Sequence, residues 1–297
     1  MSHRTKANLA LLMVSMVWGS SFVLSKDTLA HLQTFTFLTL RFLLSGLLCS
    51  ILFYRNMLTI TRRTALHGII IGTVLFGAYG LWAYGLNFTT ASKSGFIIGF
   101  SVVIVPLLSA IFLKKMPAKA SILGALVAIT GLALLSLDGS NALEKGDLFT
   151  LAAAFMFALH IITISYFTLT GDAMSLAIIQ ITVVGLLSLP VSLIWENPVI
   201  PMGINVWTNL TLLIILCTAF AYIVLNHVQK FTTPTHTALI FTTEPVFAAL
   251  FAYLLLGEIL RINGIIGSLL ILSGMVISEL DWNKWFNLKT NIQKAVE

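Results

Sequence analysis

Stretches of about 20 apolar residues follow one another along almost the whole chain, and this pattern leaves few possible folds. A helix rises about 1.5 Å per residue, so a stretch of that length crosses a hydrocarbon layer of about 30 Å. Ten such stretches cover approximately residues 7–26, 34–54, 66–88, 93–114, 119–137, 148–168, 174–195, 209–230, 235–257 and 262–280. They lack the polar residue at every second position that a transmembrane barrel needs. The sequence therefore predicts an all-α membrane protein with ten transmembrane helices.

The composition excludes a soluble domain. Hydrophobic residues make up 58% of the 297 residues and charged residues only 9%, whereas soluble domains are about 25% charged. The two cysteines fall within apolar stretches, so neither a disulfide framework nor a metal site is expected. The first stretch lacks a cleavage site before Lys26, and we expect it to be retained as a helix.

The distribution of lysine and arginine predicts the orientation. With ten spans and a cytoplasmic N-terminus, 12 of the 17 basic residues lie inside: Arg4, Lys6, Arg55, Arg62, Arg63, Lys114, Lys115, Lys119, Lys230, Lys284, Lys289 and Lys294. Only Lys26, Lys93, Lys145 and Arg261 lie in outer loops. This bias predicts a multi-pass protein of the inner or plasma membrane with both termini cytoplasmic. The net charge of +6 is thereby explained without a nucleic-acid partner.

The chain contains an internal repeat. FIIGFSVVIVPLLSAIFL (96–113) aligns approximately with LIFTTEPVFAALFAYLLL (239–256), and Pro106 matches Pro245 approximately. Each copy holds five predicted spans, and an odd number turns the second copy upside down relative to the first. We therefore expect an N-terminal repeat over residues 1–140, an inverted repeat over 141–280 and a polar cytoplasmic tail over 281–297. Inverted repeats are typical of secondary transporters, whose substrate site lies where the repeats meet.

Four segments resemble the EamA type of the drug/metabolite transporter superfamily. They are WGSSF (18–22), TLRFLLSGLL (39–48), GLNFTTASKSGFIIGFSVVIVPLLSAIF (85–112) and TTEPVFAALFAYLLLGE (242–258). The resemblance implies two inverted five-helix halves around a cavity lined mainly by the first, third, fourth, sixth, eighth and ninth helices. It also implies substrates among amino acids, other metabolites and toxic compounds. The chain departs from many relatives at Lys114 and Lys115, where they carry Gly-Glu.

Glu244 is an acid within the ninth predicted span, about ten residues from its start. A carboxylate in a membrane is costly unless it is protonated, paired or in a water-filled cavity. One interpretation makes it a proton carrier or the contact for a cationic group. The other makes it a partner for backbone groups opened by Pro245. We expect Pro106 and Pro245 to kink their helices, because proline removes a backbone donor.

His160 and Arg41 are the other ionisable residues deep within predicted spans. His160 titrates near neutral pH and can either couple to Glu244 or simply bond a neighbouring helix. Arg41 lies some seven residues from the outer end of the second span. A structural role is favoured for Arg41, because at this depth its side chain can reach the interface or cap a helix.

Four aromatic residues, Trp18, Tyr79, Trp82 and Tyr222, lie within spans, where they can line a cavity or pack between helices. Asn226 is a further candidate polar contact.

Glycines at two sets of positions predict close helix contacts. Gly68 with Gly72, and Gly95 with Gly99, are spaced for helix packing, and the second pair can also act as a hinge. Gly124, Gly131, Gly267 and Gly274 give smooth faces that suit contact between copies, so both a monomer and a homodimer stay open.

The sequence favours a secondary transporter that moves a small organic solute by alternating access. The family resemblance implies export, and proton coupling stays open. Facilitative exchange and import stay open. A channel or a membrane-embedded enzyme is disfavoured, because no filter segment, paired acids or metal-ligand spacing is present. No Walker motif occurs, and no cofactor or metal is expected. The expected partners are the solute and lipid.

Overall fold

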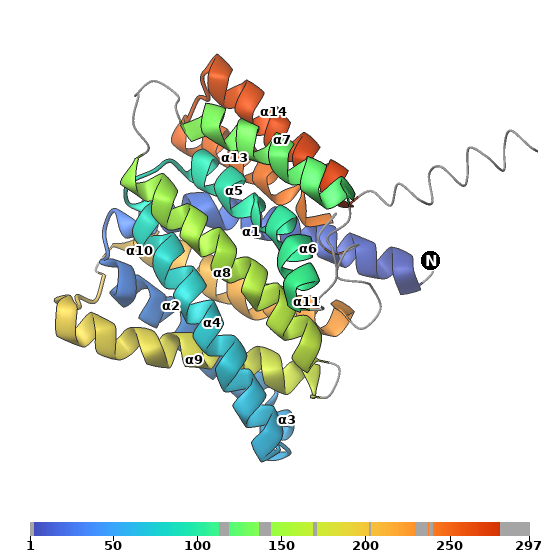
Figure 1. Ribbon diagram of the computed structural model, residues 1–297. Helices are drawn as coiled ribbons and strands as arrows, with labels where there is room; N and C mark the ends of the chain where they lie inside the picture. Colours follow the sequence, from blue (N-terminus) through green and yellow to red (C-terminus); the bar gives the residue numbers. More distant parts are fainter. Residues whose placement is uncertain are drawn as a thin grey trace, which may run out of the picture.

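All regular elements in the described part of the protein are helices. The computed structural model describes residues 3–112, 119–136, 144–168, 171–201, 203–229, 237 and 240–279 (Figure 1). The expected tail over 281–297 lies outside these residues, as do Lys114 and Lys115.

The first half contains α1 (His3–Leu29), α2 (Thr34–Leu52), α3 (Tyr54–Leu58), α4 (Arg62–Leu86), α5 (Ala91–Gly99), α6 (Ser101–Phe112) and α7 (Lys119–Ser136). The second half contains α8 (Lys145–Phe167), α9 (Ala173–Trp195), α10 (Ile204–Leu212), the π-helix η1 (Leu213–Phe220), α11 (Ala221–Gln229), α13 (Glu244–Leu256) and α14 (Ile262–Glu279).

Seven helical segments in the described residues are long and apolar enough to cross a membrane. Three shorter apolar helices, Lys119–Leu135, Glu244–Leu256 and Ile262–Ile277, occupy the places of the fifth, ninth and tenth predicted spans. The prediction of a helical membrane protein is confirmed. That each of the three shorter helices crosses the bilayer stays a prediction.

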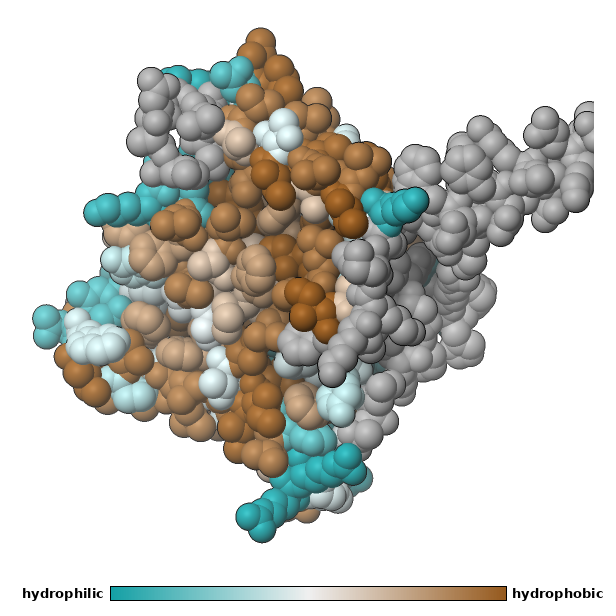
Figure 2. All heavy atoms as spheres, in the orientation of Figure 1, coloured by the Kyte–Doolittle hydropathy of each residue, from teal (hydrophilic) through white to brown (hydrophobic). Residues whose placement is uncertain are grey.

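The outer surface has the character expected of lipid-facing helices. Figure 2 shows apolar side chains over most of the visible face and hydrophilic side chains gathered at its margins. Large apolar side chains such as Leu47, Leu126 and Leu254 are exposed. Such a continuous apolar surface is stable in lipid, whereas in water it would drive aggregation.

Helix boundaries follow local chemistry. Thr61, Thr90 and Asp172 each precede a helix, and their side-chain oxygens accept a hydrogen bond from a backbone N–H in the first turn. Gly257 ends α13 in the left-handed conformation, with a φ of 65°, which glycine adopts without a steric penalty.

The two halves interleave. α1 packs on α13, α2 on α9, and α4 on both α8 and α9, while α5 contacts α13 and α6 contacts α8. Helices of the first half therefore pack mainly on helices of the second half, and the space between them is shaped by both.

Glycines bring α7 and α14 into contact within one chain. A Cβ atom at Gly131 would lie 2.5 Å from the carbonyl oxygen of Gly267, and one at Gly274 would lie 2.5 Å from that of Gly124. The expectation that these faces suit contact between copies is therefore wrong, because the faces already cover each other. Gly68 and Gly72 likewise pack on α9, and Gly95 and Gly99 on α13.

One end of the bundle, which we call the capped end, joins the halves through carboxylates. Its loops gather on the left of Figure 1, opposite the labelled N-terminus. Glu196, after α9, accepts hydrogen bonds from the backbone N–H groups of Phe35 (2.8 Å) and Thr36 (2.7 Å) at the start of α2. Glu258, after α13, accepts them from Ala91 and Ser92 (both 3.0 Å) at the start of α5. Each carboxylate satisfies free donors and the positive dipole of a helix N-terminus.

Further polar contacts join the same end. The ammonium of Lys93 lies 3.5 Å from Asp147 and 3.6 Å from Glu144, and the Thr89 hydroxyl donates to Asp147 (2.7 Å). Lys26 donates to the carbonyl oxygens of Leu86 (2.7 Å) and Thr89 (2.8 Å). The ammonium groups of Lys26 and Lys93 are thus held by acceptors of the protein.

Gly131→Leu tests the contact between α7 and α14. The added side chain meets the backbone of α14, so we expect a loss of about 1–3 kcal/mol in stability. Thermal unfolding of the purified protein in detergent, followed by the fraction that stays monodisperse, measures it. Gly203→Ala is the control, because its Cβ would meet only Val206 at 3.7 Å. Unchanged unfolding of the Gly131→Leu variant would contradict this contact.

Candidate functional site

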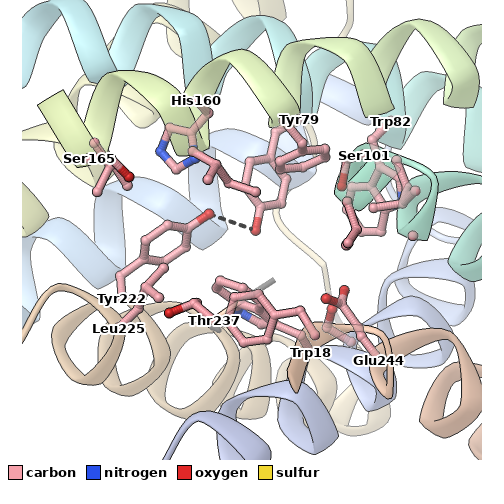
Figure 3. A pocket seen from close by; sticks show the side chains of 18 residues that line it. Trp18, Tyr79, Trp82, Ser101, His160, Ser165, Tyr222, Leu225, Thr237 and Glu244 are labelled. Carbon is pink, nitrogen blue, oxygen red and sulfur yellow. Dashed lines mark hydrogen bonds between the residues drawn. The ribbon is translucent and has the colours of Figure 1, made fainter. Parts of the chain in front are cut away.

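A cavity lies between the two halves, lined from α1, α4, α5, α6, α8, α11 and the start of α13, together with Thr237 and Phe241 (Figure 3). The resemblance implies these same spans for a central cavity. The empty space between the lining side chains is about 980 Å³, part of it open to solvent. A concave site with mainly apolar walls and a few polar groups is typical of sites that bind small molecules.

Glu244 projects into this cavity from the first residue of α13 (Figure 3). It is the one acidic residue of the described lining, and it is partly buried. Within the described part of the chain its carboxylate has no hydrogen bond or ion pair. The interpretation in which Glu244 satisfies backbone opened by Pro245 has no contact to support it among these residues.

The two prolines occupy different positions in their helices. Pro245 is in the first turn of α13, where its missing N–H costs no helical hydrogen bond, and Thr242 and Thr243 form a turn before it. Pro106 is inside α6, and the break between α5 and α6 falls earlier, at Phe100. The α5 helix approaches α13 closely at this level: a Cβ atom at Gly99 would lie 2.6 Å from Cγ of Pro245.

Aromatic residues form much of the cavity wall. Tyr79 and Trp82 come from α4, Trp18 from α1 and Tyr222 from α11. The ring centroids of Trp18 and Tyr222 are 5.5 Å apart, and those of Tyr79 and Trp82 are 5.6 Å apart. The structure therefore brings all four sequence-predicted aromatic residues into one cavity together with Glu244.

The polar atoms of these rings are bonded within the protein. The Trp18 indole donates to the Cys217 carbonyl oxygen (2.9 Å), the Trp82 indole donates to the Ser94 hydroxyl (3.1 Å), and the Tyr222 hydroxyl lies 3.2 Å from that of Tyr79. The rings are fixed by these bonds, and apart from the Tyr79 hydroxyl proton they offer mainly their faces to a ligand.

The sequence model of the EamA-like transporter family matches residues 5–137 and again residues 144–280. The chain belongs to the EamA-like transporter family. This family lies within the drug/metabolite transporter superfamily, so the resemblance noted in the sequence is confirmed. The cavity just described is thus in a membrane protein of a transporter family.

Relatives of this EamA-like chain carry transporter names. A protein of Archaeoglobus fulgidus named as an uncharacterized transporter is 32% identical over 93% of this chain and 87% of its own length. The uncharacterized transporter YyaM of Bacillus subtilis is 24% identical over 90% and 91%. A solved crystal structure aligns with a TM-score of 0.70 over 92% of this chain and 96% of its own, and at 18% identity it shows the fold alone.

His160 also lines the cavity of this EamA-like transporter, on α8. Its Nε2 atom lies 2.7 Å from Oε1 of Gln180 on α9, whose Nε2 atom has no partner among the described residues. His160 is therefore bonded to a neighbouring helix and shares a cavity with Glu244. The two interpretations drawn from the sequence are compatible in this geometry.

Asn226 lies outside the cavity lining. Its amide donates to the Tyr222 carbonyl oxygen (2.8 Å), one turn earlier in α11, and its own oxygen is buried with no partner in the described residues. Asn226 therefore contacts Tyr222, a residue of the cavity lining, but does not line the cavity itself.

Arg41 is fully buried, so the expectation that its side chain reaches the interface or caps a helix is wrong. Its Nε donates to the Thr218 hydroxyl of η1 (2.9 Å), and its Nη1 lies 3.4 Å from the Ser25 hydroxyl. The guanidinium carbon is 5.2 Å from the centre of the Tyr79 ring and 5.4 Å from that of Phe42. Hydroxyls and ring faces thus hold this cation from behind the cavity wall.

Two lining rings escaped the sequence reasoning. Phe157 lies three residues before His160 on α8, and Phe241 lies three residues before Glu244. Residues three apart lie on the same face of a helix. The spacing from His160 could therefore have predicted that Phe157 lines the cavity. For Phe241 it was not reliable, because a turn separates Phe241 from α13.

Arg41→Ala and Arg41→Met test the structural role of the buried cation. The alanine variant leaves a void and unpaired hydroxyls, so we expect it to lose about 2–5 kcal/mol of stability. Methionine fills most of the volume and removes the buried charge, so its loss is smaller. Thermal unfolding in detergent ranks the variants. An alanine variant that unfolds at the wild-type temperature would show that Arg41 does not support the fold.

Proposed function

We propose that this chain is a secondary carrier that exports a small organic solute through the cavity by alternating access. In this proposal ten spans form two inverted halves, residues 1–140 and 141–280, in the cell membrane, with both termini and the tail cytoplasmic. Glu244 serves as the group that takes up a proton or a cationic part of the solute. The observation that carries the proposal is the aromatic cavity between the halves, with one carboxylate in it that has no partner among the described residues.

Helix contacts support an inverted arrangement. α2 packs on α9, and α7 packs on α14, which pairs the second predicted span with the seventh and the fifth with the tenth. α1 packs on α13, and α8 packs on α5 and α6. A twofold axis would exchange the members of the first two pairs and would map the contact of α1 with α13 onto that of α8 with α5 and α6. The odd number of predicted spans in each half puts that axis in the membrane plane. Carriers with such symmetry work by rocking one half against the other around a fixed site.

The capped end supplies a gate for this motion. The Trp82 ring lies near this end of the cavity, makes an edge contact with Phe22 at 5.5 Å between centroids, and donates to Ser94. Glu196 and Glu258 join the halves beyond it. In the proposal the structure is closed at the capped end, which faces the outside, and release of the solute requires these carboxylates to leave the helices that they cap.

Counterflow in proteoliposomes tests the carrier, because only alternating access exchanges one solute molecule for another. We expect Glu244→Gln to slow the counterflow of solute by about 10- to 100-fold. This factor corresponds to the loss of one hydrogen bond between the solute and a charged group. Glu144→Gln is the matched control, since its partly exposed ion pair with Lys93 is outside the cavity. If the Glu244→Gln variant exchanged solute at the wild-type rate across the pH range, Glu244 would have no part in the mechanism. Downhill flux of solute without counterflow would favour a channel.

Glu258→Gln tests the gate. Amide substitution weakens the bonds to Ala91 and Ser92, so we expect the open-outside population to rise about 10-fold or more. The readout is labelling of Ser101→Cys, in the cavity wall, by a membrane-impermeant maleimide added to intact cells. The background replaces the buried Cys49 and Cys217 with alanine. Glu144→Gln, at the same end, is expected to leave labelling unchanged. Equal labelling in both variants would contradict the gate.

A further inference from the structure

The cavity has one acidic group with no ionic partner among the described residues. In the described lining, Glu244 is the acidic residue, and neither lysine nor arginine is present. A carboxylate in such an apolar setting is stabilised by a cation that pairs with it. Lys26 and Lys93 are not available for that role, because acceptors at the capped end hold both ammonium groups.

Six aromatic rings surround the remaining space: Trp18, Tyr79, Trp82, Phe157, Tyr222 and Phe241. Both indole N–H groups are bonded to the protein, so these rings present faces rather than donors. The face of an aromatic ring carries partial negative charge and attracts an organic cation. Rings and carboxylate therefore favour the same sign of charge in a ligand.

Arg41 makes one side of the cavity electrostatically different from the other. Its guanidinium contacts the Tyr79 ring and lies behind the lining, on the side of α2 and η1. In Figure 3, Glu244 and Trp18 lie on the wall opposite Tyr79 and His160. A positive ligand group is repelled from the Arg41 side and attracted to the Glu244 side, while the uncharged body of the ligand lies against Tyr79 and Phe157, whose rings contact each other edge to face at 5.3 Å between centroids.

We propose that the solute is an organic monocation with an aromatic or otherwise apolar body, bound with its cationic head between Glu244 and Trp18 and its body against Tyr79 and Phe157. This inference rests on the proposed carrier function and assigns its substrate class. An anion would face the carboxylate with neither lysine nor arginine in the described lining to receive it. A dication would keep one charge unpaired in an apolar space. A metal ion would need several oxygen, nitrogen or sulfur ligands, and the described residues contain no cluster of three or more His, Cys, Asp or Glu that could supply them.

Three probes of similar size and different charge test the substrate class on the wild-type protein, which needs no variant to fold. Benzyltrimethylammonium is the cation, benzyl alcohol the neutral molecule and benzenesulfonate the anion. Binding to the full-length protein in lipid nanodiscs is measured by calorimetry and by quenching of tryptophan fluorescence. We expect benzyltrimethylammonium to bind at least about 10-fold more tightly than the other two, as one charge-assisted contact predicts. Equal or tighter binding of the alcohol or the sulfonate would overturn the proposal.

A substitution at Glu244 tests whether the cationic probe binds beside this residue. We expect Glu244→Gln to weaken benzyltrimethylammonium binding about 10-fold or more while benzyl alcohol binding stays within about twofold. Glu144→Gln keeps wild-type affinity for all three probes. Benzyltrimethylammonium binding that is unaffected by Glu244→Gln would also overturn the proposal, because the cation would then sit elsewhere.

The counterflow assay separates this inference from the carrier function on which it rests. Exchange of benzyltrimethylammonium against itself supports both. Exchange of a neutral or anionic solute, with none for the cation, leaves the carrier function intact and refutes the substrate class. Binding of the cation without counterflow of any solute refutes the carrier function and leaves the binding site.

Discussion

Every backbone donor and acceptor that lies in hydrocarbon must find its partner within the protein, and this constraint shapes the whole structure. Long helices meet it over most of the chain, and irregular backbone is concentrated around the cavity. The break at Phe100, the turn at Thr242 and Thr243 and the π-helix η1 are all on cavity-lining spans. In η1, the carbonyl oxygen of Cys217 accepts a bond from Trp18, so a wall residue supports irregular backbone and is fixed by it.

The repeat provides a symmetric frame, and the chemistry is in the departures from it. The repeat matches Pro106 approximately to Pro245, but Pro106 is inside α6 and Pro245 is in the first turn of α13. The residue before the proline is Val105 in the first half and Glu244 in the second. The buried Arg41 is on the other side of the wall, behind Tyr79. A pair of similar halves thus encloses a cavity whose two sides differ in charge, which a symmetric pair could not do.

Hydropathy was enough to predict the helices, because lipid demands long apolar helices whatever the tertiary contacts are. The mid-span positions of Glu244, Trp18 and Tyr79 also marked them as candidates for the cavity. Arg41 was mispredicted, because its depth from a span end says nothing about the hydroxyl of Thr218, 177 residues away in the sequence, that receives it. The glycine faces of α7 and α14 were assigned to a second copy for a similar reason: spacing shows that a face is smooth but does not identify what covers it.

The carboxylate caps at one end of the bundle determine how that end can come apart. An interface of interdigitated apolar side chains would expose hydrocarbon when it opened, whereas the carboxylates of Glu196 and Glu258 and the amide groups that they cap can form hydrogen bonds with water once they separate. Separation therefore leaves no group without a partner. The contact is also electrostatic and close to solvent, so dissolved salt weakens it. The ionic strength of the surrounding medium thus becomes a variable to which the stability of the capped end responds.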